Sequence, residues 1–492
     1  MKGPEDEPLD LVRGVLGDRQ AWVVGGLVRD RLLAAEAPGP WRGVADVDIV
    51  VVEEPREVAD ALARAAAGTS FPLSEELGSW RVVARGGRWQ IDVEPLRGGA
   101  IEADLALRDF TINAVAQSLD GQRTFDPLGG LEDLAERRLR MAGPGAFVDD
   151  PLRVLRLVRQ AVDFDLQPEA DTIRGARAAA TGLAEVSAER IFAELKLIVG
   201  GRDPLAGLAL MDEVGATPVV LPEIEALRGV EQSHYHHLDV HGHTLEVLRQ
   251  TVELTRAYLA PSGGGAEDAA VVGPAELRTP IAALLDEPLA DGLTRSGALR
   301  WGALFHDAAK PLTRGVAPGG GVTFLGHDVQ GSALVREVLS RLRASDRLRT
   351  HVAALVRNHL RLGFLVHQPR PLPRRTVYEY LRACGAVGVD VTLLSIADRR
   401  ATRGRRSEEA IEAHLQLAAD MLPDALRWRA QGPPQPLWRG DELAEELGIV
   451  PGPRLGRLLE SLRAAQFAGE VSDRAGALAW ARAELASDEE RA

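Results

Sequence analysis

Two spacings of apolar residues divide the chain. From about residue 10 to 140, short β-branched runs alternate with helical patches, which predicts a small α/β domain. From Pro151 onwards, apolar residues recur three or four positions apart, which predicts helices. The expected strands are Ala21–Val24, Val47–Val52, Arg81–Ala84 and Gln90–Val93, and Glu57–Ala66 is expected to be a helix.

The predicted fold is an α/β head, with a small mixed sheet and helices, followed by an all-α remainder. A chain of 492 residues is too long for one hydrophobic core. Breaks rich in proline and glycine lie near residue 225 and at 431–434, and 261–274 and 318–322 read as a loop and a Gly-rich hairpin or loop. The expected domains are the head (10–142), a helical neck (143–229), a histidine-rich domain (230–410) and a helical tail (411–492).

Two carboxylates flank one residue at the start of a predicted strand. Strand alternation places Asp46 and Asp48 on the same face, where they repel each other unless a cation lies between them. Mg²⁺ is the divalent ion we expect there. The Gly25-Gly26 turn lets backbone N–H groups approach a phosphate, with Arg29 as a bidentate partner. Together these features predict phosphoryl or nucleotidyl transfer.

A third carboxylate, Asp92, lies on the predicted strand Gln90–Val93. Neighbouring strands would bring it beside the first two. Three carboxylates hold two metals, one that activates an attacking hydroxyl and one that stabilises the leaving pyrophosphate. The alternative is that Asp92 is a solvated strand residue.

Composition narrows the class of protein. Hydrophobic residues make up 45% and charged residues 26%, as in ordinary globular proteins. No apolar run approaches a membrane span, and the acidic start lacks a signal-peptide core, so we expect a cytoplasmic protein without membrane contact. The single Cys384 excludes a disulfide framework. A net charge of −14 argues mildly against a nucleic-acid partner but leaves room for a local basic groove.

Five motifs follow one another between residues 23 and 192. They are Gly25-Gly26-Leu27-Val28-Arg29-Asp30 with Asp46-x-Asp48, Arg108-Asp109-Phe110-Thr111-Ile112-Asn113-Ala114, Asp126-Pro127-Leu128-Gly129-Gly130-Leu131-Glu132-Asp133-Leu134, Asp149-Asp150-Pro151-Leu152-Arg153-Val154-Leu155-Arg156 and Ser187-Ala188-Glu189-Arg190-Ile191-Phe192. In this order they resemble the bacterial class II tRNA nucleotidyltransferase/poly(A) polymerase family, whose head is of the polymerase-β type.

The resemblance implies how a nucleotide is held. In the family, the Arg-Asp pair of the second motif contacts the ribose, and the residues equivalent to Asp150 and Arg153 pair with the base of CTP or ATP. A carboxylate accepts from the exocyclic amine that C and A both carry, and we expect Asp150 and Arg153 on one helical face. The alternative is a surface salt bridge, or for Arg108-Asp109 a helix-end charge pair. The expected nucleotide-binding residues are Gly25, Gly26, Arg29, Arg108, Asp109, Asn113, Asp150, Arg153 and Arg156.

One segment departs from the family pattern. Only six residues separate Arg97 from Asp104. Family members that add the whole CCA usually have a longer loop here, so the short segment resembles the CC-adding subgroup. Addition of CCA, of CC alone, or of a poly(A) tract all remain open.

The eleven histidines are concentrated between His234 and His367. His243, the His306-Asp307 pair and Asp398 resemble the ligand set of the HD phosphohydrolases. A carboxylate in an apolar helix needs a cation or several hydrogen bonds, which favours a metal at His306-Asp307. The ligands do not choose among Mn²⁺, Fe, Ni²⁺ and Mg²⁺. Possible ligands of a second metal are His327 and His359, whereas His234, His236 and His237 are expected in a polar loop.

The expected protein is a Mg²⁺-dependent tRNA nucleotidyltransferase with an accessory HD phosphohydrolase domain, whose metal is unidentified. Its expected partners are tRNA, CTP and ATP. The resemblance implies phosphatase or 2′,3′-cyclic phosphodiesterase activity on RNA ends for the HD domain, which alternatively serves only as a docking body for tRNA. Two other functions remain open: a poly(A) polymerase, and an HD phosphohydrolase whose head only binds RNA.

Overall fold

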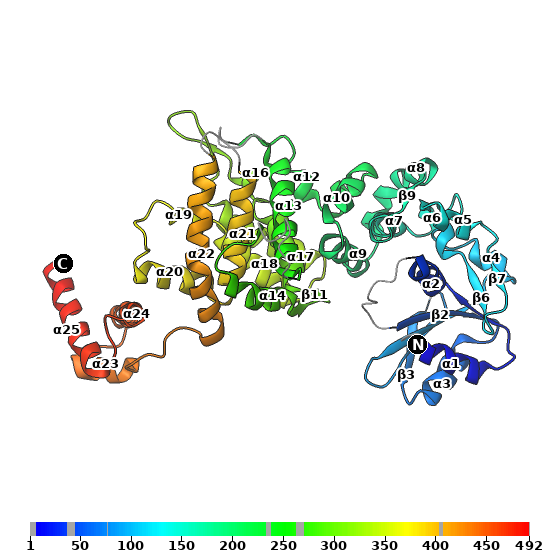
Figure 1. Cartoon of the computed structure of the whole chain (residues 1–492), viewed down its shortest axis with the longest axis horizontal. Coiled ribbons are helices and arrows are strands. Elements are labelled where there is room, and N and C mark those ends of the chain that lie inside the picture. The colour runs from blue at the N-terminus through cyan, green and yellow to red at the C-terminus, as the bar shows by residue number, and fades with distance from the viewer. Residues whose placement is uncertain are drawn as a thin grey trace. The chain divides into compact units, whose positions relative to one another are not determined.

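The computed structural model describes residues 6–36, 45–75, 77–232, 238–261, 270–402 and 407–491. It divides into two compact units, residues 1–198 with 206–220, and 199–205 with 221–492. The first unit holds a mixed sheet with helices and the second is almost entirely helical (Figure 1), which confirms the predicted fold class. The expected polar loop at His234, His236 and His237 and most of the 261–274 loop lie outside the described residues.

A seven-stranded sheet forms the centre of the first unit, in the order β3-β4-β5-β2-β1-β6-β7. β2 and β5 run parallel, and the other neighbours are antiparallel. All four predicted strands are present, but β3, β6 and β7 were not predicted, because β3 is a largely exposed edge strand and the other two are very short. The strands are β1 (Ala21–Val24), β2 (Ala45–Val51), β3 (Thr69–Ser74), β4 (Ser79–Val83), β5 (Trp89–Pro95), β6 (Ala116–Ser118) and β7 (Thr124–Phe125).

One face of this sheet is apolar and packs on α1 (Asp6–Leu16) and α3 (Pro55–Ala65). Val47 and Ile49 of β2 are completely buried in that core with Val58 and Leu62 of α3. Because strand residues alternate, Asp46 and Asp48 are turned to the opposite face. Among the described residues, seven further α-helices lie wholly in this unit. They are α2 (Gly26–Glu36), α4 (Ile101–Leu105), α5 (Gly130–Ala135), α6 (Ala146–Asp149), α7 (Arg153–Asp163), α8 (Ala170–Ala179) and α11 (Thr217–Val220).

The second unit is built around α15 (Arg295–Phe305), whose residues are all buried. Further along the chain, β12 (Gly315–Val316) and β13 (Val322–Thr323) pair as an antiparallel hairpin around the Gly-rich segment 318–322. Residues 411–492 contain most of α22 and the helices α23 to α25, and their division from the rest of the unit as a tail stays a prediction. Helices α9 (Ala188–Gly200) and α10 (Pro204–Glu213) belong partly to each unit. The main elements are α12 (Pro222–Glu225), α13 (Val240–Leu259), α14 (Arg278–Asp286), α15 (Arg295–Phe305), α16 (Lys310–Thr313), β12 (Gly315–Val316), β13 (Val322–Thr323), α17 (His327–Arg341), α18 (Asp346–Asn358), α19 (Arg361–Phe364), α20 (Arg374–Cys384), α21 (Gly388–Ala401), α22 (Ser407–Gln431), α23 (Gly440–Leu447), α24 (Pro453–Ala468) and α25 (Arg474–Arg491).

By length and composition, the described stretch 374–401 could cross a membrane, but 78% of its most apolar window is buried within the protein. It comprises α20 and α21, which pack in the helical core. Burial of this kind is typical of a core segment. The cytoplasmic location stays a prediction.

A buried ion pair joins α15 to α21. Arg295 donates to both carboxylate oxygens of Asp390, at 2.8 and 2.6 Å, and Nε2 of His351 lies 3.8 Å from Asp390 Oδ1. Burial lowers the pKa of His351 to about 4, because lost hydration outweighs the attraction of Asp390. The folded protein therefore holds His351 neutral at pH values where the unfolded chain protonates it.

We expect the free energy of unfolding of the second unit to fall as the pH is lowered from about 6.5 to 4. A folded pKa below the unfolded value means that the stability is fully present above about pH 6.5 and is lost towards the folded pKa, by up to roughly 3 kcal/mol for His351. His351→Gln should reduce this pH dependence in thermal unfolding followed by circular dichroism. Exposed His367→Gln is the control, and equal slopes for both variants would contradict the assignment.

Candidate functional site

The three carboxylates predicted for the head lie on one face of the sheet. Asp48 is the register partner of Asp92 across the parallel strands β2 and β5, and Asp46 stands opposite Gln90. Cross-strand partners share a face, so the sheet brings the three acidic residues together. Burial, reinforced by Glu94 and Asp92, raises the pKa of Asp48 to about 7, and Arg108 offsets only part of this effect. The cluster therefore needs a proton or a cation.

Two further charged residues of this face were missed from the sequence. Arg81 of β4 is the register partner of Asp92 and donates to both of its carboxylate oxygens at 2.7 Å. Glu94 lies two residues beyond Asp92 on the same face and accepts from Arg108 at 2.9 Å. Glu94 could have been predicted from the sequence, because residues two positions apart on a strand share a face. Arg81 could not, because its position opposite Asp92 depends on how β4 pairs with β5.

Gly25 brings the backbone against the acidic cluster. Its φ is +71°, and an added Cβ would lie 3.1 Å from Oδ2 of Asp48 and 3.6 Å from Nη1 of Arg108. Glycine tolerates this left-handed conformation, and its missing side chain leaves room for the carboxylate. A side chain at position 25 would therefore press on the carboxylate of Asp48 and displace it.

We expect Gly25→Ala to reduce nucleotide incorporation by roughly tenfold to a hundredfold, because a small displacement of Asp48 spoils its alignment. Gly86→Ala is the matched control. It has φ +84°, and an added Cβ meets nothing within 4 Å in the described part of the chain. Both variants carry a backbone cost of about 1–2 kcal/mol. Equal activity of the two, measured at a temperature where both are folded, would contradict the role of Gly25.

Arg108 is held by a buried carboxylate. It donates to Glu94 at 2.9 Å and to Asp104 at 3.2 Å, and Arg97 also donates to Asp104 at 2.9 Å. Asp104 is completely buried in α4. The short segment between Arg97 and Asp104 thus ends in a helix whose aspartate orients Arg108 towards the carboxylate face.

Four predicted nucleotide-binding residues form one network, in which Arg29, Asp109 and Asn113 are buried and Arg156 is partly exposed. Arg29 donates to Asn113 at 2.6 Å, Asn113 donates to Asp109 at 2.9 Å, and Arg156 pairs with Asp109 at 3.0 Å. The guanidinium of Arg29 also lies 4.0 Å from the ring centroid of Phe164. Burial alone would raise the pKa of Asp109, but Arg156 and the hydrogen bonds hold it below its ordinary value. These residues therefore orient one another rigidly.

The expectation that Asp150 and Arg153 share a helical face is wrong. Asp150 is extended, with φ −148° and ψ 99°, and α7 begins only at Arg153. The physical reason is Pro151, because a steric clash with the proline ring disfavours the helical region for the residue before it. Asp150 accepts from Arg190 at 2.7 Å. Arg153 donates to the backbone carbonyl oxygens of Leu107, Ala146 and Arg108.

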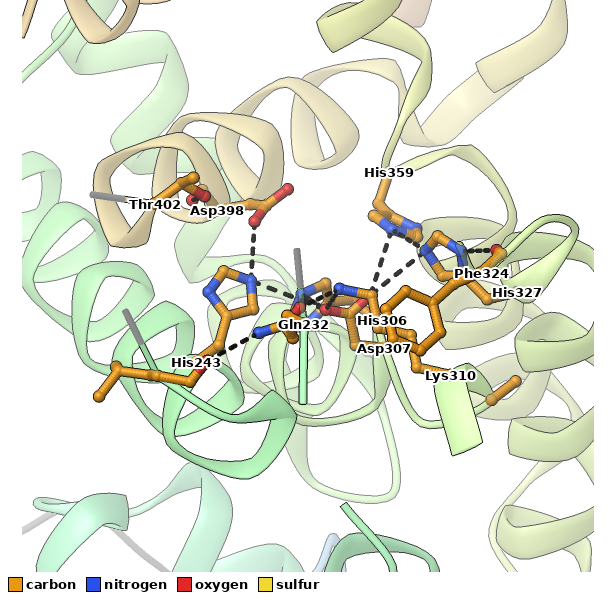
Figure 2. A network of polar contacts seen from close by, with 12 residues as sticks. Gln232, His243, His306, Asp307, Lys310, Phe324, His327, His359, Asp398 and Thr402 are labelled. Atoms are coloured by element: carbon orange, nitrogen blue, oxygen red, sulfur yellow. Dashed lines mark hydrogen bonds and ion pairs between the residues drawn. The ribbon is translucent and has the colours of Figure 1, made fainter. Parts of the chain in front are cut away.

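In the second unit, the six predicted metal ligands lie close together (Figure 2). His243, His327 and Asp398 belong to α13, α17 and α21, whereas His306, Asp307 and His359 follow the ends of α15 and α18. The expectation that the His306-Asp307 pair lies inside a helix is wrong, because α15 ends at Phe305. Five of the six ligands form two groups that share Asp307, and the ligand atoms of each group lie within 4.8 Å of one another. All members of both groups are buried. Asp398 lies 3.1 Å from Nε2 of His243. The first group is His243, His306 and Asp307, and the second is Asp307, His327 and His359.

The imidazole rings are oriented as metal ligands. Nδ1 of His306, His327 and His359 lies 2.8, 2.7 and 2.7 Å from the carbonyl oxygen three residues earlier, so each Nδ1–H donates, and in the neutral ring Nε2 is the nitrogen that can bind a metal. Nε2 of His306 is buried without a hydrogen bond of normal geometry within the described ranges. Burial lowers the pKa of His359 to about 4, which keeps that ring neutral. This donor set fits a divalent metal.

Lys310 is a residue of this site that the sequence reasoning passed over. Its Nζ lies 2.7 Å from Oδ2 of Asp307 and donates to Oε1 of Gln232 at 2.6 Å (Figure 2). The signal was its position three residues after Asp307, which is one helical turn. Lys310 neutralises part of the charge of the shared carboxylate.

Three protein-family models match the chain. The Poly A polymerase head domain matches residues 90–140, the probable RNA and SrmB-binding site of polymerase A matches 165–227, and the HD domain matches 240–402.

Similar proteins cover almost the whole chain. The A-adding tRNA nucleotidyltransferase of Deinococcus radiodurans is 34% identical over 92% of both chains. The CC-adding tRNA nucleotidyltransferase of Thermus thermophilus is 31% identical over 94% of this chain and 93% of the relative. The structure of the Thermotoga maritima CCA-adding enzyme complexed with tRNA has a TM-score of 0.60 at 20% identity, covering 98% of this chain and 96% of that one, which shows a shared fold.

Proposed function

The chain belongs to the family of bacterial tRNA nucleotidyltransferases, and from this premise we propose that its head adds C and/or A to the 3′ end of tRNA. CTP or ATP is the donor, and pyrophosphate leaves. The observation that carries the proposal is the register of Asp48 with Asp92, beside Asp46 and against Gly25. Mg²⁺ ions held by these carboxylates would polarise the attacking 3′-hydroxyl and neutralise the departing pyrophosphate.

The roles of the other head residues are part of the same proposal. Gly25, Gly26 and Arg29 hold the triphosphate through backbone N–H groups and charge. Arg108 and Asp109 contact the ribose. Asn113 and Arg156 keep Asp109 in place, and Glu94 and Asp104 hold Arg108. Asp150 and Arg153 recognise the base from a loop and a helix start, which differs from the single helix that we expected.

The experiment that tests this proposal measures how many nucleotides the protein adds to tRNA and which ones. The short segment after Arg97 supports CC addition, as in the name of the Thermus relative, whereas the Deinococcus relative is named as A-adding. We propose an assay with tRNA ending at the discriminator base or in CC, given CTP and ATP separately and together. Two C residues and no A identify CC addition, and one A on the CC substrate identifies A addition. A long A tract, or no product, would overturn the proposal.

For the second unit we propose a divalent-metal phosphohydrolase acting on RNA ends. Its support is the pair of ligand groups that share Asp307. A metal held by these residues would supply Lewis acidity towards a phosphoester and an activated water, and Lys310 lies beside the shared carboxylate. The substrate class is a terminal phosphate or a 2′,3′-cyclic phosphate. If the protein hydrolyses neither of these phosphates, the second unit serves only as a docking body for tRNA.

The four-domain division is likewise a proposal. The three family models fall inside the proposed head at 10–142, neck at 143–229 and HD domain at 230–410. The tail at 411–492 contains α23 to α25 and most of α22.

A further inference from the structure

Arg81 brings a positive charge to the carboxylate face of the head. In the register of the sheet, Arg81 of β4 stands opposite Asp92 of β5, which stands opposite Asp48 of β2. Its guanidinium binds Asp92 in a bidentate pair, with both N–O distances at 2.7 Å. The side chain keeps 28% of its exposure and that of Asp92 keeps 15%, so the pair lies at the surface of the acidic cluster.

This ion pair competes with a metal for Asp92. Bidentate arginine–carboxylate pairs are among the strongest side-chain hydrogen bonds, and here both oxygens of Asp92 are engaged. The hydrogen bond to Asp92 raises the pKa of Arg81, and the charges of Asp92, Asp46 and Asp48 add to this effect against desolvation. A guanidinium that interacts with all three carboxylates also repels a divalent cation approaching them.

We propose that Arg81 exchanges partners when the nucleotide arrives. It releases Asp92 to the metal and binds a phosphate of the incoming triphosphate instead. This inference rests on the proposed nucleotidyl transfer and adds a phosphate-binding residue to it. A guanidinium suits both partners, because carboxylate and phosphate present two oxygens with similar spacing.

The exchange couples metal binding to nucleotide binding. Without nucleotide, a metal that takes Asp92 leaves Arg81 unpaired near other cations, which weakens metal binding. With nucleotide, Arg81 regains an anionic partner, so each ligand strengthens the binding of the other. The head would then load its full metal set mainly together with the triphosphate.

The test compares Arg81→Met with Arg88→Met in the full chain. Arg88 pairs with Glu7 on the surface and is the matched control. Every sample carries Asp307→Asn to disrupt the HD ligand groups, and Mn²⁺ binding is followed by electron paramagnetic resonance without nucleotide. Arg81→Met should tighten Mn²⁺ binding about tenfold, because the competing cation is removed, and should weaken CTP binding about tenfold in calorimetry. The control should change neither.

These opposite shifts separate the exchange from a structural role. Unchanged or weaker Mn²⁺ binding by Arg81→Met, or unchanged CTP binding, would overturn the proposal. If Arg81→Met does not fold, Arg81→Lys tests the same point, since lysine keeps the charge without the bidentate geometry. It should show smaller shifts in the same directions, and no shift would overturn the proposal. Both readouts need no turnover, whereas failure of the proposed function appears as absent incorporation by the unmodified protein.

Discussion

Replacing Asp48 by asparagine is expected to lower nucleotide incorporation at least about a thousandfold. Asp48 lies between Asp92 and the backbone at Gly25, and it would be a ligand of a metal held by this face. Metal ions contribute several kcal/mol of charge stabilisation in reactions of this type, and about 4 kcal/mol corresponds to a thousandfold in rate. Incorporation of labelled CTP or ATP into tRNA under single-turnover conditions measures the effect.

Asp48→Asn should be at least as stable as the unmodified protein. Burial with Glu94 and Asp92 raises the pKa of Asp48 to about 7, so the neutral amide removes a repulsion that the folded state carries. We therefore expect an unchanged or higher midpoint of thermal unfolding, which separates lost catalysis from lost structure. Glu53→Gln is the matched control. Glu53 is exposed just beyond β2 and pairs with Arg19 at the surface, so this variant should retain full incorporation.

Asp46→Asn should reproduce the loss, while phosphoester hydrolysis by the second unit stays intact in both variants. Incorporation above about one tenth of the original rate in Asp48→Asn would assign the chemistry elsewhere. That outcome would favour an HD phosphohydrolase whose head only binds RNA.

The head shows what a single sequence reveals and what it withholds. Alternation along β2 was enough to place Asp46 and Asp48 on one face, because the intervening Val47 has to be buried. The pairing of β2 with β5 in parallel could not be read from the sequence, since register depends on the whole sheet. For this reason Asp92 was only a candidate, and Arg81 on the far side of it was not considered.

Local chemistry overrode periodicity at the start of α7. The three-residue spacing of Asp150 and Arg153 suggested a shared helical face, but Pro151 forces Asp150 into an extended conformation. The sequence contained that signal. In the second unit, by contrast, the His306-Asp307 pair was informative by itself although it follows the apolar helix α15 and does not lie inside it, because so polar a pair needs compensation when it is buried.

We propose one metal for each ligand group of the second unit. Asp307→Asn is then expected to remove both metals, whereas His243→Ala and His327→Ala should each remove one. The reason is that Asp307 belongs to both ligand groups and each of these histidines to one. Asparagine keeps the shape and an oxygen acceptor for Lys310, which limits the cost of leaving that buried ammonium unpaired. Metal content after desalting is measured by mass spectrometry in chains that also carry Asp48→Asn. We expect two metals per chain without a further change, one in His243→Ala, one in His327→Ala and none in Asp307→Asn.

Hydrolysis of 2′,3′-cyclic nucleotide and p-nitrophenyl phosphate should fall at least about a hundredfold in Asp307→Asn, with nucleotide incorporation unchanged when Asp48 is intact. Exposed His367→Ala is the control and should keep both metals and both activities. Metal retained by Asp307→Asn would contradict the shared-ligand geometry. A loss of both metals from His243→Ala would show that the groups fill cooperatively, because Asp307 is then held correctly only when the two sites are occupied together.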